Sequence, residues 1–337
     1  LSIGIQKLDD GGKKLYQNLT VMKSKAPELL AGMSTAKTGA VSLSTALAQM
    51  QAKGDFTKPQ TYVVTSQDGQ WKKTYTVSFE VNDVPTKYHF EGLDYYIFKD
   101  NDTGEEHKKF EKIYEKLPDG SKTEWNSGNA GFMITNETAG LKDYPTMQDD
   151  NGYIGKCVKL VTRSTGPMGI AFGAPIAAGN LFLGEFQIDI LNMAKSTRFG
   201  LPYRNTPIAI SGYYKYQPGA KFTDKTNTVL ENARDTFDIY AVMYESTTET
   251  PFLDGTNIKT HPSIVMMAQL KERKPTDAWT HFSMTFEPVA GRTLDPEKLR
   301  KGQYNLAIVM SSSQGGAFFR GAVGSTLWVD ELQLFHE

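Results

Sequence analysis

Short segments that alternate apolar and polar residues run through the chain from residue 88 to its end. Such alternation indicates β-strands with one buried face, and clusters of turn-forming residues separate the segments. A brief helical pattern is found at 295–301. Many strands without alternating helices predict an antiparallel β-sandwich, and a jelly roll is its expected form. Strands are expected at 88–90, 131–135, 157–162, 184–190, 207–216, 236–244, 264–270, 279–287, 304–310 and 325–335.

The final strand carries an irregularity in its pattern. Its apolar residues Leu327 and Val329 alternate as expected, but the alternation slips by one at the acidic pair Asp330-Glu331. A slip of this kind is typical of a β-bulge, because one extra residue moves the following side chains to the other face. A closing strand with an acidic pair in its middle resembles the last strand of sugar-binding β-sandwich domains, which runs antiparallel to the first strand.

Length and charge restrict the function classes. A chain of 337 residues is long for one domain, so two are expected. The net charge of −1, from 37 basic and 38 acidic residues, argues against nucleic acid or an anionic membrane surface as a partner. No apolar run approaches the roughly 20 residues of a transmembrane helix. The single cysteine, Cys157, lies in an apolar segment and is expected to be a buried strand residue.

The first 84 residues are predicted to form a small domain. A hairpin is expected at 61–81, because Asp68-Gly69 suits the positive φ angles of a tight turn. On its second strand, Tyr75 and the alternate residues after it are expected to form a half-buried face. Residues 43–51 are expected to form a short helix or an irregular crossing.

This hairpin and the preceding segment Asp55-Phe-Thr-Lys-Pro59 resemble the C-terminal half of the bacterial immunoglobulin-like modules in Bacteroides-type surface lipoproteins. The resemblance implies an immunoglobulin-like spacer at 1–84. Pro85 favours an extended residue before it, which marks a boundary. The second domain is therefore expected at 87–337.

A second resemblance covers residues 88–337, and short phrases in a fixed order carry it. These are Phe90-Glu-Gly92, Trp125-Asn-Ser-Gly-Asn-Ala-Gly131, Gly212-Tyr-Tyr-Lys-Tyr-Gln-Pro-Gly219, Phe237-Asp-Ile-Tyr-Ala-Val-Met-Tyr244 and Phe319-Arg-Gly-Ala-Val-Gly-Ser-Thr-Leu-Trp-Val-Asp-Glu331. They resemble the putative carbohydrate metabolism domain family of Bacteroidetes surface and secreted proteins. The resemblance implies a jelly roll related to carbohydrate-binding modules. It also implies export to the cell surface, outer membrane or periplasm, with any export signal or lipid anchor lost before residue 1.

Glycan binding needs exposed aromatic rings beside polar groups, because a pyranose has an apolar face and a rim of hydroxyls. Strand parity in 207–216 places Tyr213 on the face opposite the core, and Trp125 lies in a polar segment. The alternative for each candidate is packing on a loop or on the other sheet. Trp71, Trp279 and Trp328 fit strand interiors and are expected to be structural. The predicted carbohydrate-binding residues are Trp125, Tyr203, Arg204 and Tyr213.

A structural calcium ion is predicted between the first and last strands of the second domain. Related sugar-binding jelly rolls often hold calcium there, and Glu91 and Asp330 occupy suitable positions. Calcium prefers six to eight oxygen ligands, which carboxylates and carbonyls supply. The alternative is that Glu91 caps a turn and Asp330 accepts a backbone hydrogen bond at the bulge.

A catalytic site has the least support in the sequence. Glycosidases need two carboxylates about 5–10 Å apart, and no motif selects a pair from Glu185, Asp189, Asp235, Asp238 and Glu245. No catalytic residue is assigned. The charged segment 99–128 is expected to be a short helix or a long hairpin, with a flap over a binding groove as a further hypothesis.

Three functional hypotheses remain open. The first is a non-catalytic, cell-surface glycan-binding protein. The second is a structural or adhesive protein that contacts other surface proteins. The third is a glycoside hydrolase whose carboxylate pair the sequence does not reveal.

Overall fold

The computed structural model describes residues 84–337 except 101, 102, 118, 119, 190 and 290, strand residues 60–65 and 72–77, and residues 10, 12–15, 17–21, 23, 25, 27 and 31. The chain divides into two compact units, Leu1–Val81 and Asn82–Glu337. None of the described helices is long and apolar enough to cross a membrane.

The described part of the first unit contains the predicted hairpin. Strands β1 (Gln60–Thr65) and β2 (Lys72–Val77) pair antiparallel, from Gln60 opposite Val77 to Thr65 opposite Lys72. Tyr75 is 46% exposed, so the half-buried face expected there is wrong at this residue. The described positions between 10 and 31 are helical, which the sequence pattern did not indicate.

Several predictions for this unit fall on residues that the structure does not describe. The Asp68-Gly69 turn, segment 43–51 and Trp71 lie outside the described residues. An immunoglobulin-like spacer stays a prediction.

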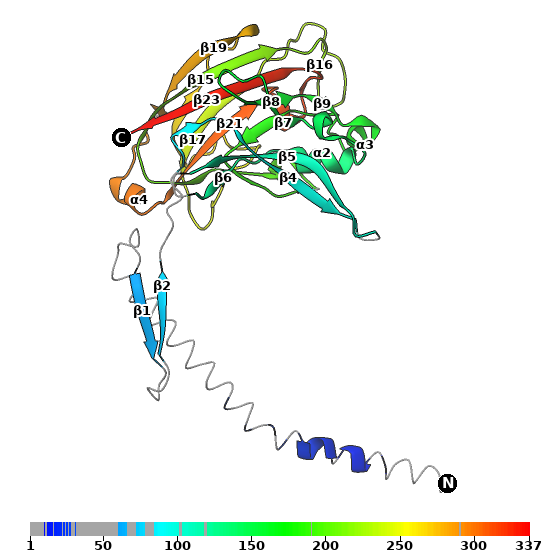
Figure 1. Ribbon diagram of the computed structural model, residues 1–337, viewed down its shortest axis with the longest axis vertical. Helices are drawn as coiled ribbons and strands as arrows, with labels where there is room; N and C mark the ends of the chain where they lie inside the picture. Colours follow the sequence, from blue (N-terminus) through cyan, green and yellow to red (C-terminus); the bar gives the residue numbers. More distant parts are fainter. Residues whose placement is uncertain are drawn as a thin grey trace. The chain divides into compact units, whose positions relative to one another are not determined.

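The second unit is an antiparallel β-sandwich (Figure 1). The first sheet has the order β19-β15-β23-β8-β7, and β3 also pairs with β23. Its strands are β3 (Lys87–Tyr88), β7 (Thr146–Asp149), β8 (Cys157–Val161), β15 (Pro207–Gln217), β19 (Thr276–Thr285) and β23 (Thr326–His336).

The second sheet has the order β11-β21-β17-β18-β20, and β14 also pairs with β21. From β8 onward the chain crosses several times between the two sheets, as in a jelly roll, and β11 with β14, β17 with β18 and β20 with β21 are successive strands within the second sheet. The predicted all-β sandwich is confirmed. The strands of this sheet are β11 (Asn180–Phe182), β14 (Leu201–Tyr203), β17 (Asp238–Glu245), β18 (Ile264–Gln269), β20 (Glu287–Pro288) and β21 (Tyr304–Ser311).

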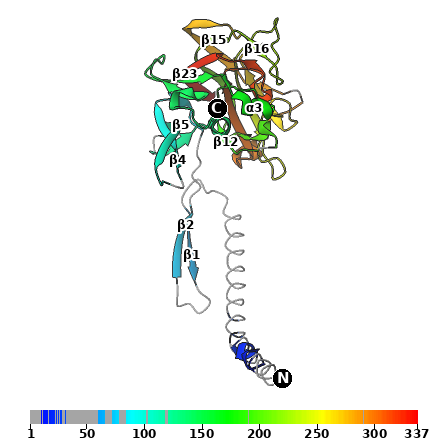
Figure 2. The same ribbon diagram turned by 90° about the vertical axis from the view of Figure 1, so that its right-hand side faces the viewer.

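Smaller elements surround the sandwich; β4 and β5 lie to one side of it (Figure 2), and α2 contacts α3. The small sheets are β4 (Gly92–Lys99), β5 (Glu106–Lys116) and β6 (Lys122–Glu124); β9 (Arg163–Ser164) and β10 (Ile176–Ala177); β12 (Gly184–Phe186) and β13 (Thr197–Phe199); and β16 (Phe222–Thr223) and β22 (Gly321–Ala322). The helices are α2 (Asn129–Thr135), α3 (Gly166–Ala171) and α4 (Pro296–Arg300), with 3₁₀ turns η1 (Leu141–Asp143), η2 (Met193–Lys195) and η3 (Gly316–Phe318).

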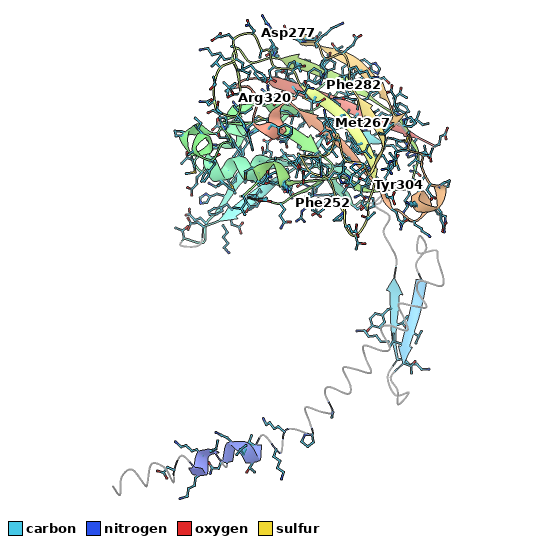
Figure 3. The ribbon with its side chains drawn as sticks, turned by 180° about the vertical axis from the view of Figure 1, so that it is seen from behind. Phe252, Met267, Asp277, Phe282, Tyr304 and Arg320 are labelled. Carbon is cyan, nitrogen blue, oxygen red and sulfur yellow. The ribbon has the colours of Figure 1, made fainter. Side chains whose placement is uncertain are left out.

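The main core lies between the two sheets. Phe282 of β19 and Tyr304 of β21, which belong to different sheets, are both buried in it (Figure 3). In β17 and β21 every residue before the last is buried. Their alternate residues belong to two clusters: Ile308 faces the main core, whereas Val309 belongs to a second cluster on the outer side of the sheet. The second sheet is therefore covered on both faces.

Most element predictions are confirmed, and one is wrong. The closing strand β23 pairs antiparallel with β3, as predicted. Its register against β15 shifts beside Asp330, where the sequence pattern predicted a β-bulge. Segment 99–128 contains the hairpin of β5 and β6, which pair antiparallel, and no helix in its described part. Residues 131–135 are helical in α2, not a strand, because the Asn129 side chain bonds both backbone groups of Thr146 and fixes this segment against β7.

A buried acid, Asp235, ties together three segments at one end of the sandwich. Its Oδ2 accepts hydrogen bonds from Ser313 Oγ at 2.6 Å, Ser325 Oγ at 2.7 Å and the Ala322 backbone N–H at 2.7 Å. Burial raises the pKa of Asp235 despite these hydrogen bonds. The carboxylate thus satisfies donors that would otherwise be buried without a partner.

We expect Asp235→Ala to lower the free energy of unfolding by about 2–5 kcal/mol, because three buried donors lose their acceptor. Asp235→Asn should cost less, since an amide oxygen can still accept from them. Guanidinium denaturation at pH 7 measures both variants. Glu231→Ala, an exposed change, is the control and should stay within about 0.5 kcal/mol of the parent. An Asp235→Ala variant as stable as this control would contradict the assignment.

Candidate functional site

The outer face of the first sheet carries a row of alternating cations and indoles. The strand registers place Trp328 of β23 between Lys159 of β8 and Lys215 of β15. Both amines lie 5.3 Å from the Trp328 ring centroid, and the Lys215 amine is also 4.6 Å from the ring of Trp279 on β19. A cation this close to an indole face is attracted by the ring quadrupole. We call this row the aromatic ladder.

Two stacked tyrosines extend the aromatic ladder along β15. Tyr213 lies two residues before Lys215, and its ring stacks on Tyr153 with centroids 3.7 Å apart and an interplanar angle of 13°. Tyr153 also meets the edge of Trp279 at 6.4 Å and is 44% exposed. The aromatic face, defined as Tyr153, Tyr213, Lys215, Trp279 and Trp328, is thus a partly exposed surface.

Tyr153 belongs to a loop, and two carboxylates hold this loop. Asp330 Oδ2 accepts from the Ile154 N–H at 3.0 Å, and Glu91 Oε1 accepts from the Lys156 N–H at 2.8 Å. Between them, Gly155 has a φ of +64°, and a Cβ there would lie 2.1 Å from Glu91 Oε1. The loop therefore requires glycine at 155, and its geometry fixes where the Tyr153 ring lies.

Asp330 is fully buried at the bulge of β23. Burial raises its pKa from 3.8 to about 6, while the backbone hydrogen bonds from residues 153, 154 and 331 act in the opposite direction. Its Oδ1 accepts from the N–H of Glu331 at 2.8 Å, and Glu331 has a φ of +49°. The acid thus stabilises both the bulge and the loop.

The donor set around Glu91 and Asp330 does not fit a calcium ion. Both carboxylates face backbone N–H groups, whereas calcium needs oxygen ligands. No group of three or more metal-ligating side chains occurs among the described residues. The hydrogen-bonding alternative for these two acids is confirmed, and calcium binding itself stays a prediction.

The predicted binding residues do not come together. Trp125 is 2% exposed and packs against Tyr88, with ring centroids 5.0 Å apart, so the expectation of an exposed ring is wrong. Tyr203 is also 2% exposed, and its hydroxyl is hydrogen-bonded to His336 Nδ1 at 2.9 Å. Arg204 is half-buried near Gly302. As predicted, Tyr213 lies on the outer face, so it alone of the four belongs to the aromatic face.

Trp279 and Trp328 were expected to be structural, yet both are half-buried on the outer face. A signal for Trp328 was present in the sequence, because it alternates with Leu327 and Val329, which face the core. Tyr153 lies in a loop, and no local pattern indicates that its ring reaches Tyr213.

A cavity of about 430 Å³ lies on the outer face of the second sheet, the face that points away from the main core. Phe182, Tyr240 and Val309 form its floor. Helix α2, the segment from α3 to β10, η2, residues 255–260 and η3 surround it. Among the described residues that line the cavity, Asp238 is the one acidic side chain, and it forms an ion pair with Lys259.

The acids considered for catalysis each have another role or none. Asp189 accepts from the backbone N–H groups of Leu191 and Asn192, and Glu245 is paired with Lys298 at 2.5 Å. Asp235 and Asp238 are both buried, and each is bonded to the partners described above. The side chain of Glu185 is 76% exposed. The thiol of Cys157 is buried, which raises its pKa to about 12.

Comparison with known proteins agrees with the family resemblance. Residues 89–335 match the family model described as "Putative carbohydrate metabolism domain". The chain is similar in sequence and structure to a putative glycoside hydrolase from Bacteroides thetaiotaomicron VPI-5482, whose crystal structure is known. The two share 45% sequence identity with a TM-score of 0.70, and the match covers 84% of this chain and 80% of that one. A second putative glycoside hydrolase, from Bacteroides vulgatus ATCC 8482, shares 38% sequence identity with a TM-score of 0.67, and the match covers 76% of this chain and 99% of that one. A comparison with curated proteins finds no match.

The raised pKa of Asp330 predicts a specific pH dependence. A carboxyl whose pKa is higher in the folded state stabilises the fold below pH 3.8, and this contribution is lost as the pH rises through about 6. The free energy of unfolding of the parent, minus that of Asp330→Asn, should therefore shrink between pH 4 and pH 7. Chemical denaturation at four pH values measures this difference. A difference that grows with pH would contradict the raised pKa.

Proposed function

The chain belongs to the putative carbohydrate metabolism domain family, and from this premise we propose that it binds glycans on the aromatic face without cleaving them. The observation that carries the proposal is the exposed ring of Tyr153 beside the half-buried indoles of Trp279 and Trp328. Aromatic rings on a partly exposed surface give the apolar face of a pyranose a surface to stack on.

Polar groups beside the rings supply the second requirement, hydrogen-bonding partners for sugar hydroxyls. The Lys215 amine lies between the two indoles, and the exposed His281 ring is 5.3 Å from Tyr213. Asp149 accepts from Trp328 Nε1 at 3.3 Å and pairs with Lys159 at 3.4 Å. Cations and an acid beside the indoles favour a polyhydroxylated ligand over a purely apolar one.

The acids near the aromatic face support binding over hydrolysis. Burial alone would raise the pKa of Asp149, but hydrogen bonds from Asn151 and Trp328 and the charge of Lys159 hold it below its ordinary value. Asp149 is therefore an acceptor at neutral pH and not a proton donor. Asp330 has a raised pKa, but it is fully buried behind the loop it holds. Neither of these two acids is thus suited to act as a general acid on a ligand of this face.

The proposal includes export and display at the cell surface, with the first unit as a spacer. The family resemblance supports this part. Proteinase treatment of intact cells that produce the full-length protein tests it, because a surface protein is degraded and a cytoplasmic one is protected.

We expect Trp279→Ala and Tyr153→Ala each to weaken binding to a glycan identified on a glycan array by about tenfold or more, since each removes a ring on which the sugar stacks. Phe172→Ala is the matched control, because Phe172 is 67% exposed and lies on the C-cap of α3, outside the aromatic face. Calorimetry with the purified chain measures the affinities. Unchanged binding in both ring variants would show that the glycan does not bind at the aromatic face. Binding to no glycan on the array would contradict the proposed function.

We expect the bound glycan to be released intact, and its affinity to be unchanged when calcium is removed by a chelator. The physical reasons are the lowered pKa of Asp149, which keeps this acid ionised, and the N–H donors that occupy Glu91 and Asp330. Chromatography of the glycan after prolonged incubation and titrations with and without chelator measure the two outcomes. Cleavage that Asp149→Asn abolishes would contradict the non-catalytic assignment, and loss of binding with chelator would restore the calcium prediction.

A further inference from the structure

The cavity over the second sheet has an aromatic floor. Phe182, Phe199, Tyr240 and Val309 are all at least 94% buried and line it from four strands, β11, β13, β17 and β21. A volume of about 430 Å³ is within the usual range for a small-molecule site, roughly 300–1,000 Å³. The cavity has room for a compact ligand with an apolar body.

Most polar side chains around the cavity are already hydrogen-bonded within the protein. A sugar placed here would lose water from its hydroxyls and find few unused partners, which costs free energy. Bonds of this kind join Thr135 to Phe132 O at 3.1 Å, Thr165 to Ala174 O at 2.5 Å, Thr197 to Gly255 N at 3.0 Å, Asn257 to Asp254 N at 2.8 Å, Ser311 to Ser313 O at 2.9 Å and Ser313 to Asp235 at 2.6 Å. The lining is therefore poorly suited to a sugar.

At one end of the cavity one acid is shared between two bases. Asp238 pairs with Lys259 and with Arg273, whose Nη1 lies 3.2 Å from Asp238 Oδ1, so one buried acid faces two bases. The Lys259 side chain is 32% exposed, lines the cavity and lies with its amine 4.2 Å from the Tyr240 ring centroid. Lysine has three N–H donors, so it can bond Asp238 and a ligand together. An anionic group would balance the excess charge.

The wall of the cavity contains a strained residue. Phe319 follows η3 in the left-handed region at a φ of +55°, which is unfavourable for a side chain of this size. Its ring lines the cavity, and the neighbouring Phe318 is 55% exposed. Strained backbone of this kind is concentrated where a side chain must be held for a ligand.

We propose that this cavity binds a small carboxylic acid with an apolar body, whose carboxylate pairs with Lys259 and whose body packs on Tyr240 and Phe319. This site lies apart from the aromatic face and goes beyond the proposed glycan binding. Charge complementarity selects the anion, and the aromatic floor selects the apolar body.

Calorimetry with 3-phenylpropionate and its neutral analogue 3-phenylpropanamide tests the proposal on the full chain. We expect the acid to bind about tenfold more tightly than the amide, because only the acid forms a charged hydrogen bond with the amine. Lys259→Met keeps the aliphatic stem, and Asp238 keeps Arg273 as its partner. This variant should bind the acid no more tightly than the amide. Equal binding of both ligands by the parent, or of the acid by parent and variant, would overturn the proposal.

Phe319→Gly separates binding from stability. Glycine adopts the left-handed conformation without strain, so the free energy of unfolding should stay level or rise, while the affinity for 3-phenylpropionate should fall at least about threefold. Phe172→Ala, outside the cavity lining, should leave this affinity unchanged. Trp279→Ala should leave it unchanged too, which keeps failure of this site distinct from failure of the glycan proposal. A Phe319→Gly variant with full affinity would overturn the role of the ring.

Discussion

The burial of β17 and β21 on both faces determines how the rest of the second unit is arranged. Their inward residues complete the main core with the first sheet, and their outward residues must be covered by other segments. The covering layer includes Leu253 and Ile258 from loops, and its incomplete closure leaves the cavity. The first sheet has no such requirement in its centre, because Lys215, Trp279 and Trp328 on its outer face tolerate water. One sheet thus offers a cavity and the other an open surface.

The acidic pair of the closing strand connects the fold to the open surface. A bulge at Asp330 turns this carboxylate towards the loop at 153–156, and Glu91 reaches the same loop from the other end of the domain's sequence. Burying a carboxylate costs free energy, as the raised pKa of Asp330 shows, and backbone N–H groups offset part of that cost. The result is a fixed position for Tyr153 against Tyr213. The two acids therefore position the aromatic face.

The strands could be predicted from the sequence because alternation is a local property, whereas the site depended on contacts between distant segments. Trp125 was predicted to be exposed because of its polar neighbours Asn126 and Asn129. Both amides are in fact used inside the protein, Asn126 on the carbonyl of Gly184 at 2.6 Å and Asn129 on Thr146. The same contact of Asn129 holds the start of α2, which includes 131–135, where a strand was expected. Parity placed Tyr213 correctly and would have placed Trp328 too, but nothing local links Tyr153 to either.

The two candidate sites differ in the ligand that their physical chemistry selects. On the aromatic face, rings and charged groups remain in contact with water, so a ligand can keep most of its hydroxyls hydrated while one face stacks. In the cavity, the lining hydroxyls are committed to the protein and one amine carries unbalanced charge. A polyhydroxylated ligand loses more than it gains there, whereas an apolar acid gains at both ends. Because the main core separates the outer faces of the two sheets, a substitution on one face has no direct contact through which to disturb the other.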